Sequence, residues 1–191
     1  MKGTYYFLIK PLHDRYNNTT QVGDKELIVN TEVFNHQYVS REAIVVGLPS
    51  EFKTEIKEGD QVIVHHNVFR RWHNIRGEEK NSSSYILEDL YKVSIDQIFA
   101  YKRNDNWKAL DKYSFIQPIQ NEDGGEKQGV GLVKYSNEFA VGDLVGYKPS
   151  GEYEFIIDGK RLYRVLNIFI TVKYEHEGKE KEYNPSWLQS S

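Results

Sequence analysis

Hydrophobic residues recur in short runs along the whole chain, and turn residues separate the runs. Residues 56–64, IKEGDQVIV, show the pattern plainly: a Gly-Asp pair marks a tight turn, and Val62 and Val64 alternate with other positions behind it. An alternation with period two is typical of a strand with one buried face. No segment carries more than a turn or two of convincing helix, so the sequence predicts an all-β protein.

Similar patterns predict further strands in the first half of the chain. Pro11 marks an edge or bulge position at the end of its strand, because proline has no N–H for a ladder. Residues 15–26 are too polar to supply a buried face and are predicted to be a loop, and residues 67–84 to be a projecting loop or hairpin. The other predicted strands are residues 4–12, 27–33, 42–46, 85–90 and 93–101, the last starting with a Ser94/Gln97 cap and a short turn.

The strand pattern occurs twice in the same order, which indicates a duplication. The offset between the copies falls along the chain, so the second copy is shorter by 24 residues between its proline strand and its Gly-Asp turn. The matched segments are 6–12 with 113–119 at an offset of 107, 59–60 with 142–143 at 83, 90–93 with 162–165 at 72, and 98–99 with 168–169 at 70.

We therefore expect two tandem all-β units, each a small Greek-key-like barrel or sandwich, with the second copy shortened. The first unit is predicted to span residues 1–103 and the second, degenerate unit residues 113–176. Residues 104–112 are predicted to be a linker and residues 177–191 a polar C-terminal tail.

The composition of the chain excludes several classes of function. The 191 residues suffice for two small units, and 28% charged with 39% hydrophobic residues describe a soluble globular protein. The chain has no cysteine, which excludes disulfides, thiolate catalysis and cysteine-ligated zinc. Its net charge of −3 gives no overall attraction to nucleic acid. With no signal-peptide pattern at its start and no apolar run that would span a bilayer, we expect a cytoplasmic protein.

Residues 8–15, LIKPLHDR, resemble the first strand of the GroES-type co-chaperonins, which carries a Pro-Leu-His-Asp-Arg sequence. The resemblance continues through residues 44–47, 56–64 and 93–100 in the order of that family. The second copy keeps Pro118 and the two later matched segments, and so resembles a further, degenerate unit. The resemblance implies two tandem GroES-like barrels, and the high Asn, Lys and Tyr content fits a fast-diverging, phage-encoded member.

Members of that family form rings that cap a barrel-shaped chaperonin, to which they dock by a flexible loop ending in an aliphatic triplet. In one alignment, residues 15–26 are this loop and Leu27, Ile28 and Val29 are the triplet. In another alignment, residues 27–33 form a buried strand and the docking loop is lost. The second unit has no aliphatic triplet in its corresponding segment, residues 120–129, and is not expected to bind a chaperonin.

Two other clusters have competing interpretations. His65, His66 and His73, with His13 nearby, suggest a metal site, but adjacent histidines on a strand point to opposite faces, so we expect solvated loop histidines and no metal. The group Arg70, Arg71, Trp72, His73 and Arg76 mixes cations with an aromatic ring, as does a nucleic-acid patch, a cation–π cluster or a subunit interface.

Trp187 and Leu188 are the two apolar residues of the polar tail. Isolated apolar anchors of this kind pack on a neighbouring chain or cover the chain's own barrel, and we favour the neighbouring chain. Arg70, Arg71, Trp72, Trp187 and Leu188 are therefore the predicted interface residues.

No pattern of catalytic residues stands out, so we expect neither an enzyme nor a cofactor. Gly124-Gly125 is a hairpin signal and lacks the spacing of a dinucleotide-binding loop. The leading hypothesis is a ring-forming co-chaperonin with a chaperonin as its partner. The alternative is a structural or adaptor protein, for instance a virion component, that keeps the fold without the docking loop.

Overall fold

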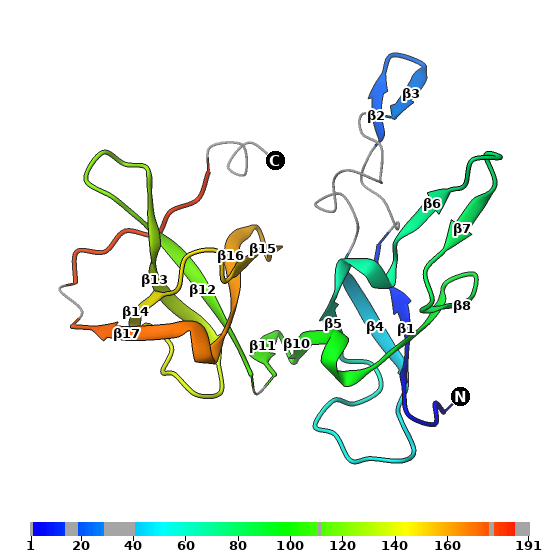
Figure 1. Ribbon diagram of the computed structural model, residues 1–191, viewed down its shortest axis with the longest axis horizontal. Helices are drawn as coiled ribbons and strands as arrows, with labels where there is room; N and C mark the ends of the chain where they lie inside the picture. The colour runs from blue at the N-terminus through cyan, green and yellow to red at the C-terminus, as the bar shows by residue number, and fades with distance from the viewer. Residues whose placement is uncertain (1, 14–18, 29–40, 111, 176–177, 186–191) are drawn as a thin grey trace. The chain divides into compact units, whose positions relative to one another are not determined.

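The computed structural model describes residues 2–13, 19–28, 41–110, 112–175 and 178–185 (Figure 1). In these residues, strands make up the regular structure apart from three short 3-10 helices, His66–Val68 (η2), Ile95–Gln97 (η3) and Asn167–Phe169 (η4). The all-β prediction is confirmed. The chain divides into two compact units, Met1–Asn106 (unit 1) and Trp107–Ser191 (unit 2).

The main sheet of the first half has seven antiparallel strands in the order β11-β10-β5-β4-β1-β9-β8. Two hairpins, β2–β3 and β6–β7, form separate two-stranded sheets. The strands are β1 (Phe7–Pro11), β2 (Thr19–Val22), β3 (Lys25–Ile28), β4 (Glu42–Gly47), β5 (Gln61–Val64), β6 (Arg71–His73), β7 (Glu79–Asn81), β8 (Tyr85–Leu87), β9 (Leu90–Val93), β10 (Ile98–Arg103) and β11 (Asn106–Ala109). The segment predicted to be a linker thus contains strand β11.

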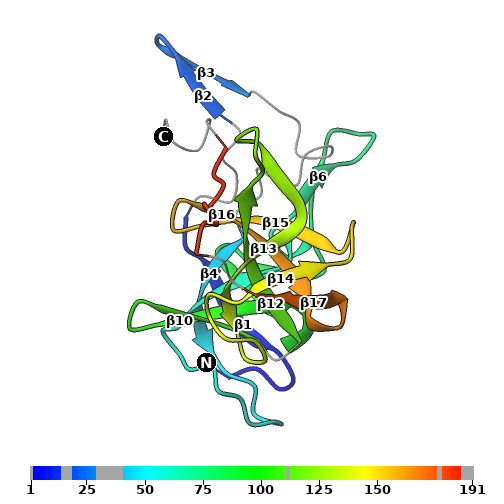
Figure 2. The same cartoon turned by 90° about the vertical axis from the view of Figure 1, so that its left-hand side faces the viewer.

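The main sheet of the second half has six antiparallel strands in the order β15-β16-β12-β13-β14-β17, and Figure 2 shows β12, β13 and β14 side by side. Its strands are β12 (Tyr113–Gln120), β13 (Glu126–Ser136), β14 (Leu144–Tyr147), β15 (Glu152–Ile157), β16 (Lys160–Leu166) and β17 (Ile170–Tyr174). This order repeats β8-β9-β1-β4-β5-β10 of the first sheet strand for strand.

The two sheets also share their register. Ile9 lies opposite Val45 and Tyr91, and its counterpart Ile116 lies opposite Val133 and Tyr163. A bulge precedes the isoleucine in both copies. Strand pairing that agrees at this level, irregularities included, supports the predicted duplication.

One predicted match between the copies is wrong by two residues. Ile98 pairs with Val64, and the equivalent residue opposite Tyr147 is Ile170, which gives an offset of 72 where the sequence suggested 70. Ile168 belongs instead to η4 and is 83% exposed. The error arose because isoleucine occurs at both 168 and 170, and only strand pairing tells the two apart.

The largest part of the shortening of the second copy lies between its first two strands. The offset is 107 between β1 and β12, 88 between β4 and β13, and 83 between β5 and β14, so 19 of the 24 missing residues lie between the first two strands. Unit 1 therefore carries a long insert there.

Each unit buries its own core. In unit 1 the inward-facing residues of β1, β4, β5 and β9 are buried, among them Phe7, Ile9, Val45, Val62 and Tyr91. In unit 2 the corresponding cluster is Ile116, Val133, Val145, Tyr147, Tyr163 and Val165. Both main sheets end in edge strands, β11 and β8 in one and β15 and β17 in the other, so the described strands do not close into the predicted barrels.

Hydrogen bonds connect the Gly-Asp turn before β5 to strands β4 and β10. Gly59 has φ +89°, a value that favours glycine, and its N–H donates to the Val45 carbonyl at 2.8 Å. The Asp60 carboxylate accepts the Lys57 N–H at 2.8 Å and so closes the turn. Asp60 also binds the guanidinium of Arg103 on β10, with Nε–Oδ1 at 2.9 Å.

Unit 2 repeats this turn with a more exposed cation. Gly142 has φ +91° and donates to the Val133 carbonyl at 2.8 Å, and Asp143 accepts the Ala140 N–H at 3.1 Å. The cation is Lys173 on β17, whose ammonium lies 2.8 Å from Asp143 and whose side chain is mostly exposed.

The two aspartates differ in what sets their pKa. Burial raises the pKa of Asp60, but hydrogen bonds from Arg103 and from the Lys57 N–H outweigh burial and hold the pKa below its usual value. The hydrogen bond from Lys173 lowers the pKa of Asp143. A carboxylate with a lowered pKa in the folded state stabilises the fold above the pKa it has when unfolded, about 4, and loses that effect as the pH falls.

We therefore predict that Asp60→Asn lowers the free energy of unfolding by about 2 kcal/mol at pH 7, since it removes charge-assisted hydrogen bonds from a buried carboxylate. Asp143→Asn serves as the matched control and should cost less than about 1 kcal/mol, because water screens its lysine partner. Urea unfolding at pH 7 and at pH 3 measures both, and the Asp60→Asn difference should shrink at pH 3. Equal costs for the two variants would contradict this account.

Candidate partner-binding sites

The insert between β1 and β4, residues 12–41, is not needed to join the two strands. β1 and β4 are antiparallel neighbours, as are β12 and β13 of unit 2. Unit 2 joins its pair by a tight turn in which the Gly125 N–H donates to the Asn121 side chain and the Asn121 N–H to the Gly125 carbonyl, both at 2.8 Å. The β1–β4 insert must therefore be explained by something other than sheet connectivity.

The described part of the insert is the β2–β3 hairpin. Thr20 pairs with Leu27 and Thr19 with Ile28, and Gly23 with φ +64° makes the turn. Residues 15–26 were predicted to be a loop, and this is wrong for residues 19–26, because local pairing across a Gly-Asp turn needs no buried face. Within the described residues, β3 pairs only with β2 and is not a strand of the seven-stranded sheet.

The predicted docking triplet lies at the end of this hairpin. Leu27 and Ile28 are the last residues of β3, and Val29 lies outside the described residues. The assignment of these three residues to chaperonin binding stays a prediction.

A second hairpin, β6–β7, carries the predicted cation and aromatic cluster. This β6–β7 arm, residues 71–81, confirms the expectation of a hairpin in residues 67–84. Trp72 is 38% exposed, and the Arg71 guanidinium lies 3.3 Å from Glu79 on the opposite strand. The Arg70 carbonyl accepts the Ser82 N–H at 3.0 Å and so closes the base of the arm.

The tip of the arm is a rigid turn built on Asn74. The Asn74 side-chain oxygen accepts the N–H groups of Arg76 and Glu78 at 2.9 and 3.0 Å, and its amide donates to the Glu78 carboxylate at 2.8 Å. This turn presents Ile75 fully exposed to solvent. The exposure of Ile75 was not predicted, because its sequence position does not reveal that it occupies the tip of a turn.

The histidines do not lie as a strand would place them. His65 and His66 stack with their ring centroids 4.3 Å apart, because the chain leaves β5 at Val64 and enters η2 at His66. The prediction that the two rings point to opposite faces is therefore wrong. Nδ1 of His65 accepts the Asn67 N–H at 3.1 Å and caps η2. In the described part of the chain, no three His, Asp or Glu side chains gather as a metal would require.

The tail begins as a strand-like segment on unit 2. The Lys181 carbonyl accepts the Gln120 N–H, and the Tyr183 N–H donates to the Pro118 carbonyl, both at 2.8 Å. Glu182 forms ion pairs with Lys134 and with Lys160, and the Lys134 hydrogen bond in particular lowers its pKa. This part of the tail thus packs on its own unit, while Trp187 and Leu188 lie outside the described residues.

A shallow groove lies beside the Gly-Asp turn of unit 2, between the start of β14 and the end of β17. We define this β14–β17 groove by the apolar side chains of Val141, Leu144 and Tyr174 and by its charged rim of Asp143, Lys173 and Glu175. The Tyr174 ring lies over Gly146, where a Cβ would be only 3.0 Å from the ring. The groove is not predictable from the sequence, because its residues come together only when β14 pairs with β17.

Comparison with known proteins assigns no family: no family model matches the sequence, and no similar curated protein is found. Among the described residues, no helix is of the length and apolarity needed to cross a membrane.

We predict that Asn74→Ala loosens the tip of the arm, because it removes three hydrogen bonds from one turn. The rate of trypsin cleavage after Arg76 should rise by about tenfold or more, as a turn that loses about 1.5 kcal/mol opens more often. Asn121→Ala is the control, since it removes a similar turn hydrogen bond in unit 2 and should leave cleavage at Arg76 unchanged. An unchanged rate in Asn74→Ala would show that the turn does not depend on this side chain.

Proposed function

We propose that the chain is a non-enzymatic, co-chaperonin-like protein of the cytoplasm, in which unit 1 caps a chaperonin through Leu27, Ile28 and Val29. The observation that carries this proposal is the β1–β4 insert: it separates two directly paired strands, and its described hairpin pairs only with itself. In the equivalent place, unit 2 has a tight turn. A segment that the sheet does not need is free to serve a partner.

The energetics of such an insert suit reversible capping. Burying an aliphatic side chain in a partner's groove contributes about 1.5 to 3 kcal/mol, so a triplet supplies several kcal/mol. Ordering the flanking segment on docking opposes part of this gain and keeps release fast enough for a folding cycle.

The assignment of both units to a GroES-like fold, here with open sheets, is part of the proposal. It is supported by the Pro-Leu-His-Asp-Arg run at residues 11–15, which begins at the last residue of β1, and by the second unit's repetition of the strand order. We further propose assembly into a ring-like homo-oligomer by strand pairing at the sheet edges. β10 is covered by β11, whereas its counterpart β17 pairs only with β14 among the described strands.

The alternative function is a structural or adaptor protein, for example a virion component. The β6–β7 arm favours it, because unit 2 has only residues 148–151 between the corresponding strands β14 and β15. An added arm that exposes Trp72 and Ile75 suits a protein that binds several neighbouring subunits.

We predict that replacing Leu27, Ile28 and Val29 by serine weakens binding to a purified GroEL-type chaperonin by at least about 100-fold, because three apolar docking groups are lost. Titration calorimetry measures the binding, and urea unfolding of the same variant supplies the control. Stability should change by less than about 0.5 kcal/mol if the triplet serves docking. Loss of the fold would instead support the alignment in which residues 27–33 are a buried strand.

A graft between the copies tests the same proposal without point substitutions. Residues 12–41 are replaced by residues 119–129, the connection that unit 2 itself uses between equivalent strands. We predict that unit 1 keeps its strand content by circular dichroism, because the register at both ends of the graft is the same, and that chaperonin binding is lost. A folded graft that still binds the chaperonin would place the docking site outside the insert.

A further inference from the structure

We propose that the tip of the β6–β7 arm of one copy docks into the β14–β17 groove of a second copy of this chain. The arm tip is Ile75 with Arg76, and the groove is the one formed by Val141, Leu144 and Tyr174. This contact joins unit 1 of one molecule to unit 2 of the next. It does not depend on chaperonin capping and is separate from strand pairing at sheet edges.

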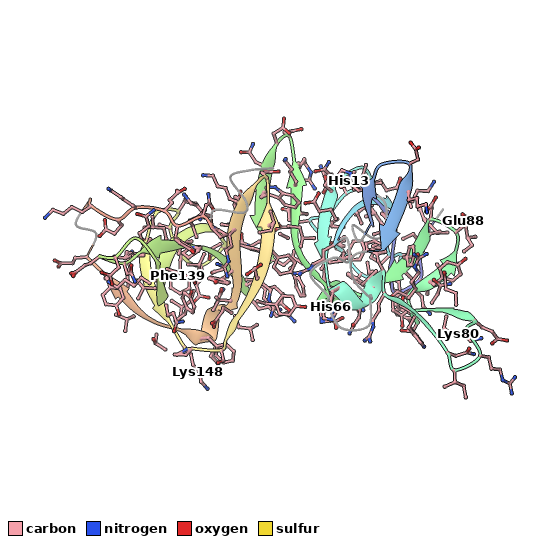
Figure 3. All side chains as sticks on the ribbon, turned by 90° about the horizontal axis from the view of Figure 1, so that it is seen from above. His13, His66, Lys80, Glu88, Phe139 and Lys148 are labelled. Carbon is pink, nitrogen blue, oxygen red and sulfur yellow. The ribbon has the colours of Figure 1, made fainter. Side chains whose placement is uncertain are left out.

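The arm tip has the properties of a preformed anchor. Ile75 is fully exposed, and the three hydrogen bonds to the Asn74 side chain fix the turn that carries it. An apolar side chain on a turn that is already rigid loses little conformational entropy when it is buried by a partner. In Figure 3, Lys80 marks the arm that carries this turn.

The groove has the properties of the matching receptor. Val141 is 72% exposed and Tyr174 is 44% exposed, so two sizeable apolar side chains border a concave site beside a rigid turn. Gly142 in its lining adds no side chain that would fill it. A single aliphatic side chain buries more of its surface in such a site than it would on a flat surface.

The charges of the two surfaces also favour docking of the arm tip in the groove. Residues 70–80 contain four Arg or Lys and two Glu, a net charge of +2 in a chain whose net charge is −3. The groove has carboxylates at Asp143 and Glu175 and one ammonium at Lys173, which is paired with Asp143. With Ile75 in the groove, Arg76 is the neighbouring cation that meets Glu175, so the apolar and ionic contacts coincide.

The arm suits a protein partner better than a nucleic acid or a membrane. Lys80 and Arg71 already bind Glu78 and Glu79 at 3.2 and 3.3 Å, which reduces the charge offered to phosphates. One exposed isoleucine buries too little apolar surface to hold a protein on a bilayer. Insertion into a pocket on a second copy uses both its exposed methyl groups and the adjacent guanidinium.

Because the arm and the groove are different surfaces, the contact is heterologous and each copy can donate one arm and receive another. Repetition closes a ring or extends a filament. A heterologous contact can therefore be restored by mixing a variant that has a damaged arm with one that has a damaged groove. A symmetric dimer contact would not be restored in this way.

The experiment uses full-length Ile75→Asp and Val141→Asp, and sedimentation velocity over a concentration series. Each variant alone should self-associate at least about tenfold more weakly than the wild type, as expected when one buried aliphatic side chain is replaced by a charge. An equimolar mixture should associate more strongly than either variant alone, because one variant keeps its groove and the other keeps its arm. Ile168→Asp is the control and should associate as the wild type does, because this 83% exposed isoleucine of η4 lies outside the arm, the groove and the edge strands.

Three results would overturn the proposal: a wild-type chain that stays monomeric at every concentration, single variants that assemble as the wild type does, or a mixture that forms no complex. The second result would leave strand pairing at sheet edges intact, since neither substitution touches an edge-strand backbone. Circular dichroism of each variant checks folding, and both substituted side chains are exposed. Restored assembly in an Arg76→Glu, Glu175→Arg double variant, after loss in each single one, would support the ionic contact.

Discussion

The Gly-Asp turn is the constraint on which the rest of each unit depends. The positive φ of Gly59 and Gly142 lets the turn N–H reach a carbonyl of the preceding long strand, Val45 or Val133, and the aspartate carboxylate closes the turn from within. This arrangement fixes the register of β5 on β4 and of β14 on β13. Once that register is set, the strands on either side follow in the same order, and the connections elsewhere are free to change length.

The two copies differ where this constraint does not act. Unit 1 has the β1–β4 insert and the β6–β7 arm, while unit 2 replaces both with short connections and is followed by the strand-like tail segment that pairs with β12. Both cores keep the same aromatic and aliphatic positions, such as Tyr91 with Tyr163. The two units therefore differ in their exposed connections and share the packing that makes each sheet.

Much of the fold follows from the sequence, because alternation, turn residues and a repeated order are local signals. The all-β class, the turn at Gly59 and the hairpin in residues 67–84 were predictable in this way. Features that depend on pairing between distant segments were not predictable. They are the position equivalent to Ile98, which the sequence misplaced by two residues at Ile168, the stacked His65 and His66, and the groove beside Tyr174. The β2–β3 hairpin was missed because residues 15–26 are largely polar and because its strands pair only with each other.

The unequal connections in the two units have a consequence for valency. Only the first copy carries a long insert, so an assembly presents one such segment per chain and not one per sheet. When several segments are tethered in one assembly, the second and later attachments occur at a high effective concentration, and the total avidity rises steeply with their number. Having half as many segments per sheet therefore lowers the total avidity of such an assembly, and makes its release, one contact at a time, easier.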